Sequence, residues 1–282
     1  MSVIKDEVVF KGRTVFNQIK LKPSGEASSN ESNKWPKFMA VNENSSRINY
    51  YQVDYNEDEG IKFKSMWTMD FDKIHDFDFI GDFLVIADGE LSEKQLLKIS
   101  LQDRKPTNIP TKQVSSRGAW KLSCLESKQI IALYVKHTND LHFYENFEHS
   151  FYVQSPFSGQ ISQLQITQDF LIIGQLEKHI VQVYKTNLTH KTLSAFIQIE
   201  GFWGNFAIHG ALLYTSIMGS QKEVVVTNLK SKSQHHLEAE TKFVPLVALD
   251  DKILLTKERH NNTTIHVFII PAIDSAQSEM VN

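Results

Sequence analysis

The sequence predicts an all-β fold, a β-propeller of six four-stranded blades. One pattern, in which apolar and polar residues alternate before a tight turn and a short apolar run, occurs at 74–86 and again, position for position, at 161–173. Alternation is typical of a half-buried strand, and an apolar run after a tight turn is typical of its buried partner in one hairpin. Looser copies bring the repeats to six, and no stretch has the sustained 3.6-residue periodicity of a capped helix.

The six copies can be aligned on their turns, which are 41 to 46 residues apart. That spacing is the length of a propeller blade. The turn positions are Lys37, Asp82, Lys128, Asp169, Ala211 and Lys252. After each turn we expect a third strand, at 48–53, 95–99, 141–144, 180–184, 223–226 and 265–270. A weaker fourth strand usually follows, which completes a blade. Seven blades would need a seventh turn, so we favour six.

The two ends of the chain complement each other. The last copy stops at Pro271 before a fourth strand, whereas a spare strand at 7–10 precedes the first blade's own first strand at 14–21. Because an open ring leaves two unpaired edges, we expect the N-terminal strand to close it. Residues 1–273 then form a single domain. We expect a flexible polar loop at 24–34 inside the first blade and a disordered tail at 274–282.

Composition excludes several classes of protein. A net charge of -3 argues against a general nucleic-acid binder, which usually carries a basic excess. The single cysteine, Cys124, allows no intramolecular disulfide and fits a reducing compartment. We find no apolar run of signal-peptide length near Met1 and no membrane-spanning stretch, so we expect a cytoplasmic or nuclear protein without a membrane partner.

The repeat resembles the WD-repeat-like propeller superfamily. The likeness covers most of the chain and rests on hydrophobic pattern, since no copy carries the Gly-His pair or the closing Trp-Asp pair of the standard repeat. The resemblance implies a protein-interaction scaffold, a non-catalytic subunit of a multiprotein complex.

No set of residues indicates catalysis or a cofactor. The chain has no Gly-x-Ser-x-Gly elbow and no glycine-rich phosphate loop, and Cys124 lies between apolar neighbours as a core thiol would. We therefore expect no enzyme activity, no cofactor and no small-molecule substrate.

Metal binding is the main alternative to this interpretation. Asp72, His75, Asp76 and Asp78 begin the second blade and could hold Ca²⁺ in a propeller channel, as in some six-bladed metal-dependent hydrolases. The corresponding residues of other blades, such as Gln163, do not continue the ligand set. We interpret the cluster as the solvated start of a strand and expect no metal.

Aromatic residues mark one possible partner-binding surface. Connections between blades should bring Phe157 close to Phe202 and Trp203 on one face, where large rings can anchor a protein partner. The alternative is that these rings fill the joints between neighbouring blades.

Basic turns should surround these rings. Lys136, Lys178 and Lys257 recur in turns between second and third strands, on the same face under the usual strand order. These lysines would suit a partner protein in which acidic residues flank an apolar anchor. A nucleic-acid-associated subunit is a further alternative that we do not favour.

Overall fold

The computed structural model describes residues 3–9, 16–22, 38–43, 45–56, 60–90, 93–111, 114–157, 159–218, 223–238, 243–248, 253–258 and 264–269. The loop expected at 24–34 and the tail expected at 274–282 lie outside the described residues.

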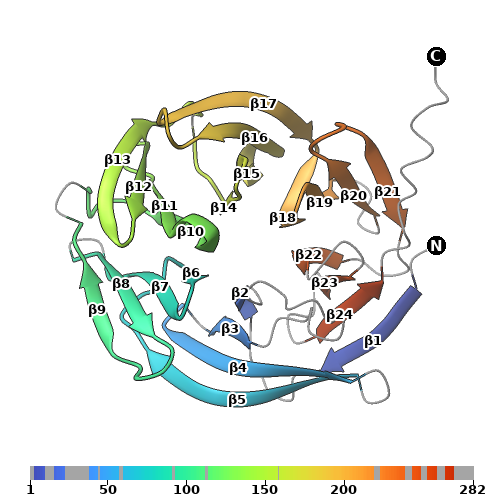
Figure 1. Cartoon of the computed structure of the whole chain (residues 1–282). Coiled ribbons are helices and arrows are strands. Elements are labelled where there is room, and N and C mark those ends of the chain that lie inside the picture. The colour runs from blue at the N-terminus through green and yellow to red at the C-terminus, as the bar shows by residue number, and fades with distance from the viewer. Residues whose placement is uncertain are drawn as a thin grey trace.

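Five blades are each built from four consecutive antiparallel strands (Figure 1). Blade 1 contains β2 (Phe16–Lys22), β3 (Phe38–Glu43), β4 (Arg47–Asn56) and β5 (Gly60–Asp70). Blade 2 contains β6 (Asp76–Ile80), β7 (Phe83–Asp88), β8 (Gln95–Ser100) and β9 (Pro106–Ile109). Blade 3 contains β10 (Trp120–Leu125), β11 (Ile130–Val135), β12 (Asp140–Glu145) and β13 (Glu148–Gln154). Blade 4 contains β14 (Gln163–Ile166), β15 (Phe170–Gln175), β16 (Ile180–Asn187) and β17 (Thr192–Glu200). Blade 5 contains β18 (Phe202–His209), β19 (Leu212–Ile217), β20 (Glu223–Asn228) and β21 (Gln234–Glu238).

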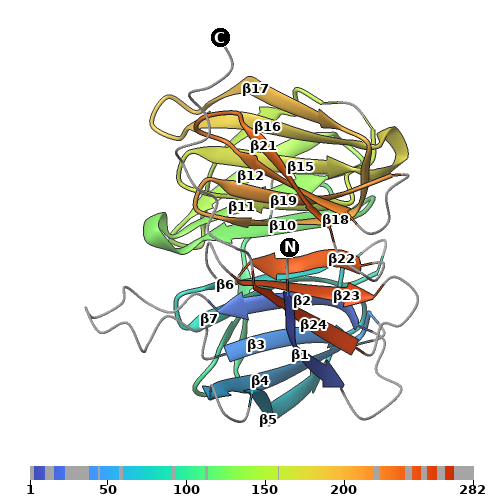
Figure 2. The same cartoon turned by 90° about the vertical axis from the view of Figure 1, so that its right-hand side faces the viewer.

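One further sheet takes strands from both ends of the chain, and we call it the terminal sheet. It contains β22 (Phe243–Ala248), β23 (Ile253–Glu258), β24 (Thr264–Ile269) and β1 (Val3–Val9). β1 pairs antiparallel with β24, and both views show the two strands side by side (Figures 1 and 2).

The expected all-β propeller with four-stranded blades is confirmed. Each expected third strand overlaps an observed one, from β4 in blade 1 to β24 in the terminal sheet. The only helices among the described residues are two single turns of 3₁₀ helix, η2 (Glu126–Lys128) and η3 (Leu176–Lys178). Both occupy tight turns between strands, and both are followed by a left-handed residue, Gln129 and His179 respectively.

The core lies in the joints between blades, because each sheet buries a face against the next one. Ile131 and Leu133 of β11 pack with Val85 of β7 between blades 2 and 3. At the next joint, Tyr134 of β11 packs with Ile173 of β15. The first strand of every blade lies nearest the centre of the ring (Figure 1). Residues of β2, β6, β10, β14 and β18 line a central cavity, which we call the channel.

Candidate interaction face

The turns between second and third strands meet the connections between blades on one face of the ring, which we call the connection face. In the β11–β12 turn, Lys136 Nζ donates to Gln160 Oε1 at 2.6 Å, and Asn139 Nδ2 donates to the Phe157 carbonyl oxygen at 3.0 Å. At the next joint, the amide of Phe202 donates to the carbonyl oxygen of His179 at 2.8 Å. The connection face therefore brings together the neighbourhoods of the sequence-predicted aromatic and basic residues.

Phe157 and Phe202 are buried in the joints, which corrects the hypothesis that they anchor a partner. Phe157 is 4% exposed, and its ring centroid lies 5.5 Å from that of Tyr134 between blades 3 and 4. Phe202 is fully buried beside Phe206 between blades 4 and 5. Packing there is tight, since a Cβ at Gly174 would lie 3.0 Å from the Phe202 ring. Both rings fill space between two sheets, where close packing requires large apolar side chains.

Trp203 differs from both phenylalanines because it is only half-buried. Its indole ring stacks on the imidazole of His179, with ring centroids 5.6 Å apart and planes at 18°. His179 ends η3 with a φ of 55°, and its Nδ1 lies 3.3 Å from the Phe202 carbonyl oxygen. The turn after η3 thus orients the one predicted aromatic residue that is partly open to a partner.

Two exposed apolar side chains accompany Trp203 on the connection face. Leu176, at the start of η3, is 37% exposed, and Met218, directly after β19, is 55% exposed. The amide of Met218 donates to the Gly201 carbonyl oxygen at 2.6 Å, which ties it to the strand that begins at Phe202. We call Leu176, Trp203 and Met218 the apolar patch.

Leu176 and Met218 could not be predicted from local pattern, because one apolar residue in a polar turn forms no pattern. An alignment of the blades would have found them. Each is the first residue after the second strand of its blade, where blade 3 has Lys136.

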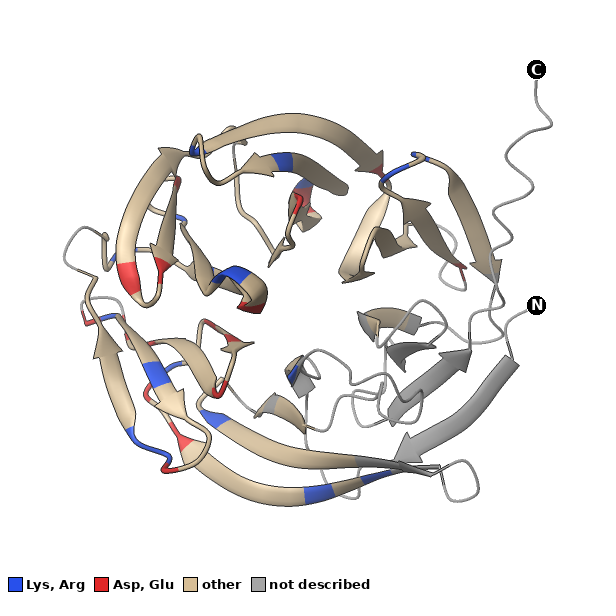
Figure 3. Cartoon of the chain, viewed as in Figure 1, with Lys and Arg blue, Asp and Glu red and all other residues tan. Residues whose placement is uncertain are grey.

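Two of the three predicted basic residues border one connection. Lys136 is exposed and bonds to Gln160. Lys178 is also exposed, and a Cβ at the adjacent Gly159 would lie 3.4 Å from its Cε. Both lysines therefore lie over the connection between blades 3 and 4. The side chain of Lys257 lies outside the described residues. Lys and Arg are distributed over several blades, with Asp and Glu among them (Figure 3).

The acidic residues of β6 face the neighbouring blades and not the solvent. Asp76 accepts from Gln18 Nε2 and from the amide of Leu122, both at 3.0 Å. Asp78 accepts from the amide of Cys124 at 2.9 Å. The two aspartates are 3% and 7% exposed, so our interpretation of them as a solvated strand start is wrong. They satisfy backbone N–H groups on the channel-facing edge of β10, which its own sheet leaves unpaired.

Hydrogen bonds of the same kind join the inner strands of further blades around the channel, and we call this set of bonds the inner belt. Ser123 Oγ donates to Asp78 at 3.2 Å and accepts from the amide of Ile166 at 3.1 Å. Gln163 bonds twice to the backbone of Phe206, donating to its carbonyl at 2.7 Å and accepting from its amide at 2.9 Å. The inner belt thus joins β2, β6, β10, β14 and β18 in sequence.

A lysine from blade 1 offsets part of the negative charge within the inner belt. Lys20 Nζ lies 3.5 Å from Asp78. Burial lowers the pKa of Lys20, but the charges of Asp78 and Asp76 raise it more, so the pKa is above its ordinary value. Burial and Asp78 raise the pKa of the Cys124 thiol, which therefore stays protonated as a core residue.

The described residues contain no group of three or more His, Cys, Asp or Glu side chains placed to hold a metal ion. They also include no helix with the length and apolar character required to cross a membrane.

Four-stranded blades around a common channel define the chain as a β-propeller, and solved structures share that fold. The β-propeller domain of Cps50 (Swd1) from Myceliophteria thermophila is 11% identical, with a TM-score of 0.61 over 84% of this chain and 81% of that one. A chain of the nidogen/laminin complex is 11% identical, with a TM-score of 0.57 over 76% and 82%. KlHsv2 with loop 6CD replaced by a Gly-Ser linker is 15% identical, with a TM-score of 0.54 over 70% and 62%. No family model and no curated protein sequence matches the chain.

Proposed function

We propose that the chain is a non-enzymatic scaffold subunit that binds another protein through the connection face. The apolar patch is the observation that carries this proposal. Of the four exposed large hydrophobic side chains among the described residues, Leu176 and Met218 lie on this face, while Met66 and Tyr152 lie on outer strands. Trp203 adds a large ring whose orientation is set by His179, and such rings are common interface hot spots.

The proposed partner has an apolar anchor with acidic flanks. Lys178 lies in η3 two residues after Leu176, and Lys136 lies across the adjoining connection. Charges at an interface rim mainly steer the encounter and select the partner, whereas the apolar centre supplies affinity. We place the protein in the cytoplasm or nucleus, in keeping with its single buried cysteine.

The experiment compares two Met→Asp variants of the full chain. Met218→Asp puts a charge into the apolar patch, and Met66→Asp puts one on β5 at a side chain that is 41% exposed. Each is used as bait in affinity purification with quantitative mass spectrometry. We expect a set of proteins that the wild type and Met66→Asp recover equally and that Met218→Asp no longer recovers. The melting temperature of Met218→Asp should equal that of the wild type.

Equal recovery by both variants would overturn the proposed face. Recovery of nucleic acid in place of protein partners would favour the nucleic-acid alternative, if that binding weakens steeply as the salt concentration increases.

We also propose that the terminal sheet is a sixth blade, closed by β1. Its β22 packs against blade 5, since a Cβ at Gly204 would lie 3.1 Å from Val244 and Ala248 joins the cluster around Tyr214. β22 also contacts β2 of blade 1. These contacts support a ring that continues from blade 5 through the terminal sheet to blade 1.

Deleting residues 1–12 tests this closure, because the edge of β24 would lose its partner strand. We expect a clearly lower melting temperature, whereas deletion of residues 274–282 should leave it unchanged. Equal melting temperatures for the full chain and the N-terminal deletion would refute closure by β1.

A further inference from the structure

The face opposite to the connection face carries the turns between first and second strands and between third and fourth strands, and we call it the turn face. Three of its turns between third and fourth strands share one pattern, which is Ser or Asn, then Leu, two further residues, and Arg or Lys. They span 100–104 in blade 2, 187–191 in blade 4 and 228–232 in blade 5. In each turn the side-chain oxygen of the first residue accepts from the amide of the fourth, at 3.4, 3.0 and 3.3 Å. The first residue therefore fixes all three turns in the same way.

The last residue of each of these turns is basic and left-handed. Arg104, Lys191 and Lys232 have φ values of 59°, 55° and 63° respectively. Glycine adopts this conformation at the least cost, so the backbone does not explain why a basic residue occupies the position. All three side chains are exposed. What the three turns have in common is thus a basic group that is presented to the solvent.

In blades 4 and 5 this basic residue lies over a phenylalanine of the preceding blade. Lys191 Nζ is 5.1 Å from the ring centroid of Phe151 on β13, and Lys232 Nζ is 4.7 Å from that of Phe196 on β17. An aromatic ring attracts an ammonium group through its quadrupole but carries no net charge. The rings therefore orient the two lysines without neutralising them.

A second lysine shares the ring at the joint between blades 4 and 5. Lys185 Nζ of β16 lies 4.8 Å from the Phe196 centroid. The ring itself is held in the joint by Phe170, with centroids 5.3 Å apart. The ammonium groups of Lys185 and Lys232 are thus less than about 10 Å apart, within one Debye length at 0.1 M salt, and repel each other. An anion that binds both would relieve this repulsion.

Lysines outnumber carboxylates in this part of the turn face. The salt bridges found in the described part of the chain include neither Lys185 nor Lys232. The turns of blades 4 and 5 on the turn face contain one acidic residue, the exposed Asp169, against Lys191, Lys230 and Lys232. The joint between blades 4 and 5 therefore presents a net positive charge.

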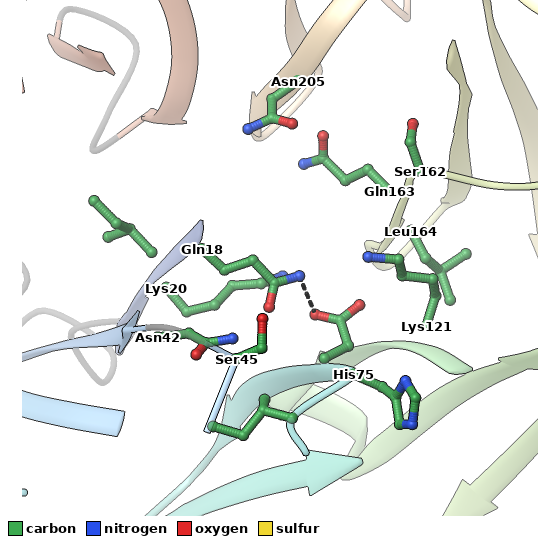
Figure 4. Close-up of a pocket in the computed structure, with 13 residues that line it drawn as sticks. Gln18, Lys20, Asn42, Ser45, His75, Lys121, Ser162, Gln163, Leu164 and Asn205 are labelled. Atoms are coloured by element: carbon green, nitrogen blue, oxygen red, sulfur yellow. Dashed lines mark hydrogen bonds between the residues drawn. The ribbon is translucent and has the colours of Figure 1, made fainter. Parts of the chain in front are cut away.

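Lysines in other parts of the ring have a carboxylate beside them. Lys20 and Lys121 line the channel together with Asp76 (Figure 4). On the turn face of blades 1 and 2, Lys22 Nζ pairs with Asp82 at 2.7 Å. The joint between blades 4 and 5 differs from both places, because its lysines lie over a ring and keep their charge for a partner.

The chemistry of this joint favours a phosphate group on a protein. Two ammonium groups match the charge of a phosphorylated side chain, which is close to -2, and lysine binds phosphate as a point charge. Single-stranded nucleic acid needs open rings on which bases stack, whereas lysines lie over these rings. A membrane surface needs apolar side chains that insert, and none of the four exposed large hydrophobic residues of the described chain lies in a turn of the turn face.

We propose that the turn face carries a second binding surface, at the joint between blades 4 and 5, for a phosphorylated segment of a partner protein. The ammonium groups of Lys185 and Lys232 bind the phosphate, and Phe196 holds them on either side of one joint. Lys191 and Lys230 attract the segment and steer its approach. This surface is separate from the apolar patch, so it does not depend on the function proposed for the connection face.

Immobilised degenerate peptide libraries test this surface on the purified full chain. The libraries are identical except for the fixed central residue, which is phosphoserine, phosphotyrosine, serine or glutamate. We expect a phosphorylated library to retain the chain and the serine and glutamate libraries to retain much less. Fluorescence anisotropy with the retained peptides then measures affinity. Lys185→Gln and Lys232→Gln should each weaken binding about 10-fold, the effect of losing one hydrogen bond to a charged group.

Lys128→Gln is the matched control, because Lys128 is an exposed lysine of η2 on the turn face of blade 3. It should bind phosphopeptides like wild type, and all three variants should keep the wild-type melting temperature. The proposal is overturned if neither phosphorylated library retains the chain better than the serine and glutamate libraries do. It is also overturned if Lys185→Gln and Lys232→Gln bind like wild type or no more weakly than Lys128→Gln.

Two further probes test the choice of a protein segment. They are vesicles made of equal parts of phosphatidylcholine and phosphatidylserine, and a single-stranded DNA oligonucleotide. Both should bind the chain more weakly than the phosphopeptides do. Tighter binding of either one, lost in Lys232→Gln, would assign the joint to a membrane or to nucleic acid and overturn the proposal.

Discussion

Asp78 occupies the centre of the inner belt, and its removal should cost far more stability than loss of an exposed aspartate. Its carboxylate accepts from the Cys124 amide at 2.9 Å and from Ser123 Oγ at 3.2 Å, and it lies 3.5 Å from Lys20 Nζ. In Asp78→Ala these groups lose their acceptor, and an ammonium that is mostly buried loses its counter-ion. Breaking such a pair costs about 3–5 kcal/mol, a large part of a typical total of about 5–15 kcal/mol.

Urea unfolding followed by tryptophan fluorescence measures this loss, with the midpoint and slope giving the free energy of unfolding. Asp70→Ala is the control, because Asp70 pairs with Arg47 at 2.7 Å while its side chain is 69% exposed. Exposed pairs contribute roughly 0–1 kcal/mol. If the unpaired ammonium causes most of the loss, adding Lys20→Met to Asp78→Ala should recover part of it. A loss for Asp78→Ala no larger than that for Asp70→Ala would refute a structural role for the belt.

Two further predictions follow from buried rings. His142 Nδ1 lies 3.1 Å from His149 Nε2, and burial, with the charge of His149, lowers the pKa of His142 below 6.5, although Asp140 raises it. The unfolded chain therefore takes up protons first as the pH falls below about 6.5, so the urea midpoint should drop between pH 7 and pH 5, and His142→Phe should flatten that dependence. Phe202→Ala should cost about 3–5 kcal/mol as a core truncation, whereas the half-buried Trp203→Ala should cost roughly half as much. Equal losses for these two variants would mean that Trp203 also belongs to the core.

Local pattern was enough to predict the strands. Alternation and apolar runs such as 161–173 are properties of neighbouring residues, so β14 and β15 could be placed without knowledge of what they pack against. The same holds for the turn at Lys128, where the structure has η2.

The sequence by itself thus determined the repeating four-strand unit and the positions of its turns, because these depend on the period of the residues. Only the tertiary structure decided which residues are accessible. Asp76 and Asp78 have the polar pattern of an exposed strand start, and they are buried because the unpaired edge of β10 supplies their donors. Phe202 is enclosed because it packs into the joint with blade 4, whereas Trp203 stacks on His179 at the connection face and stays half-buried. In a propeller, side chains become buried where two blades pack together, and this packing brings residues more than forty positions apart in the sequence into contact.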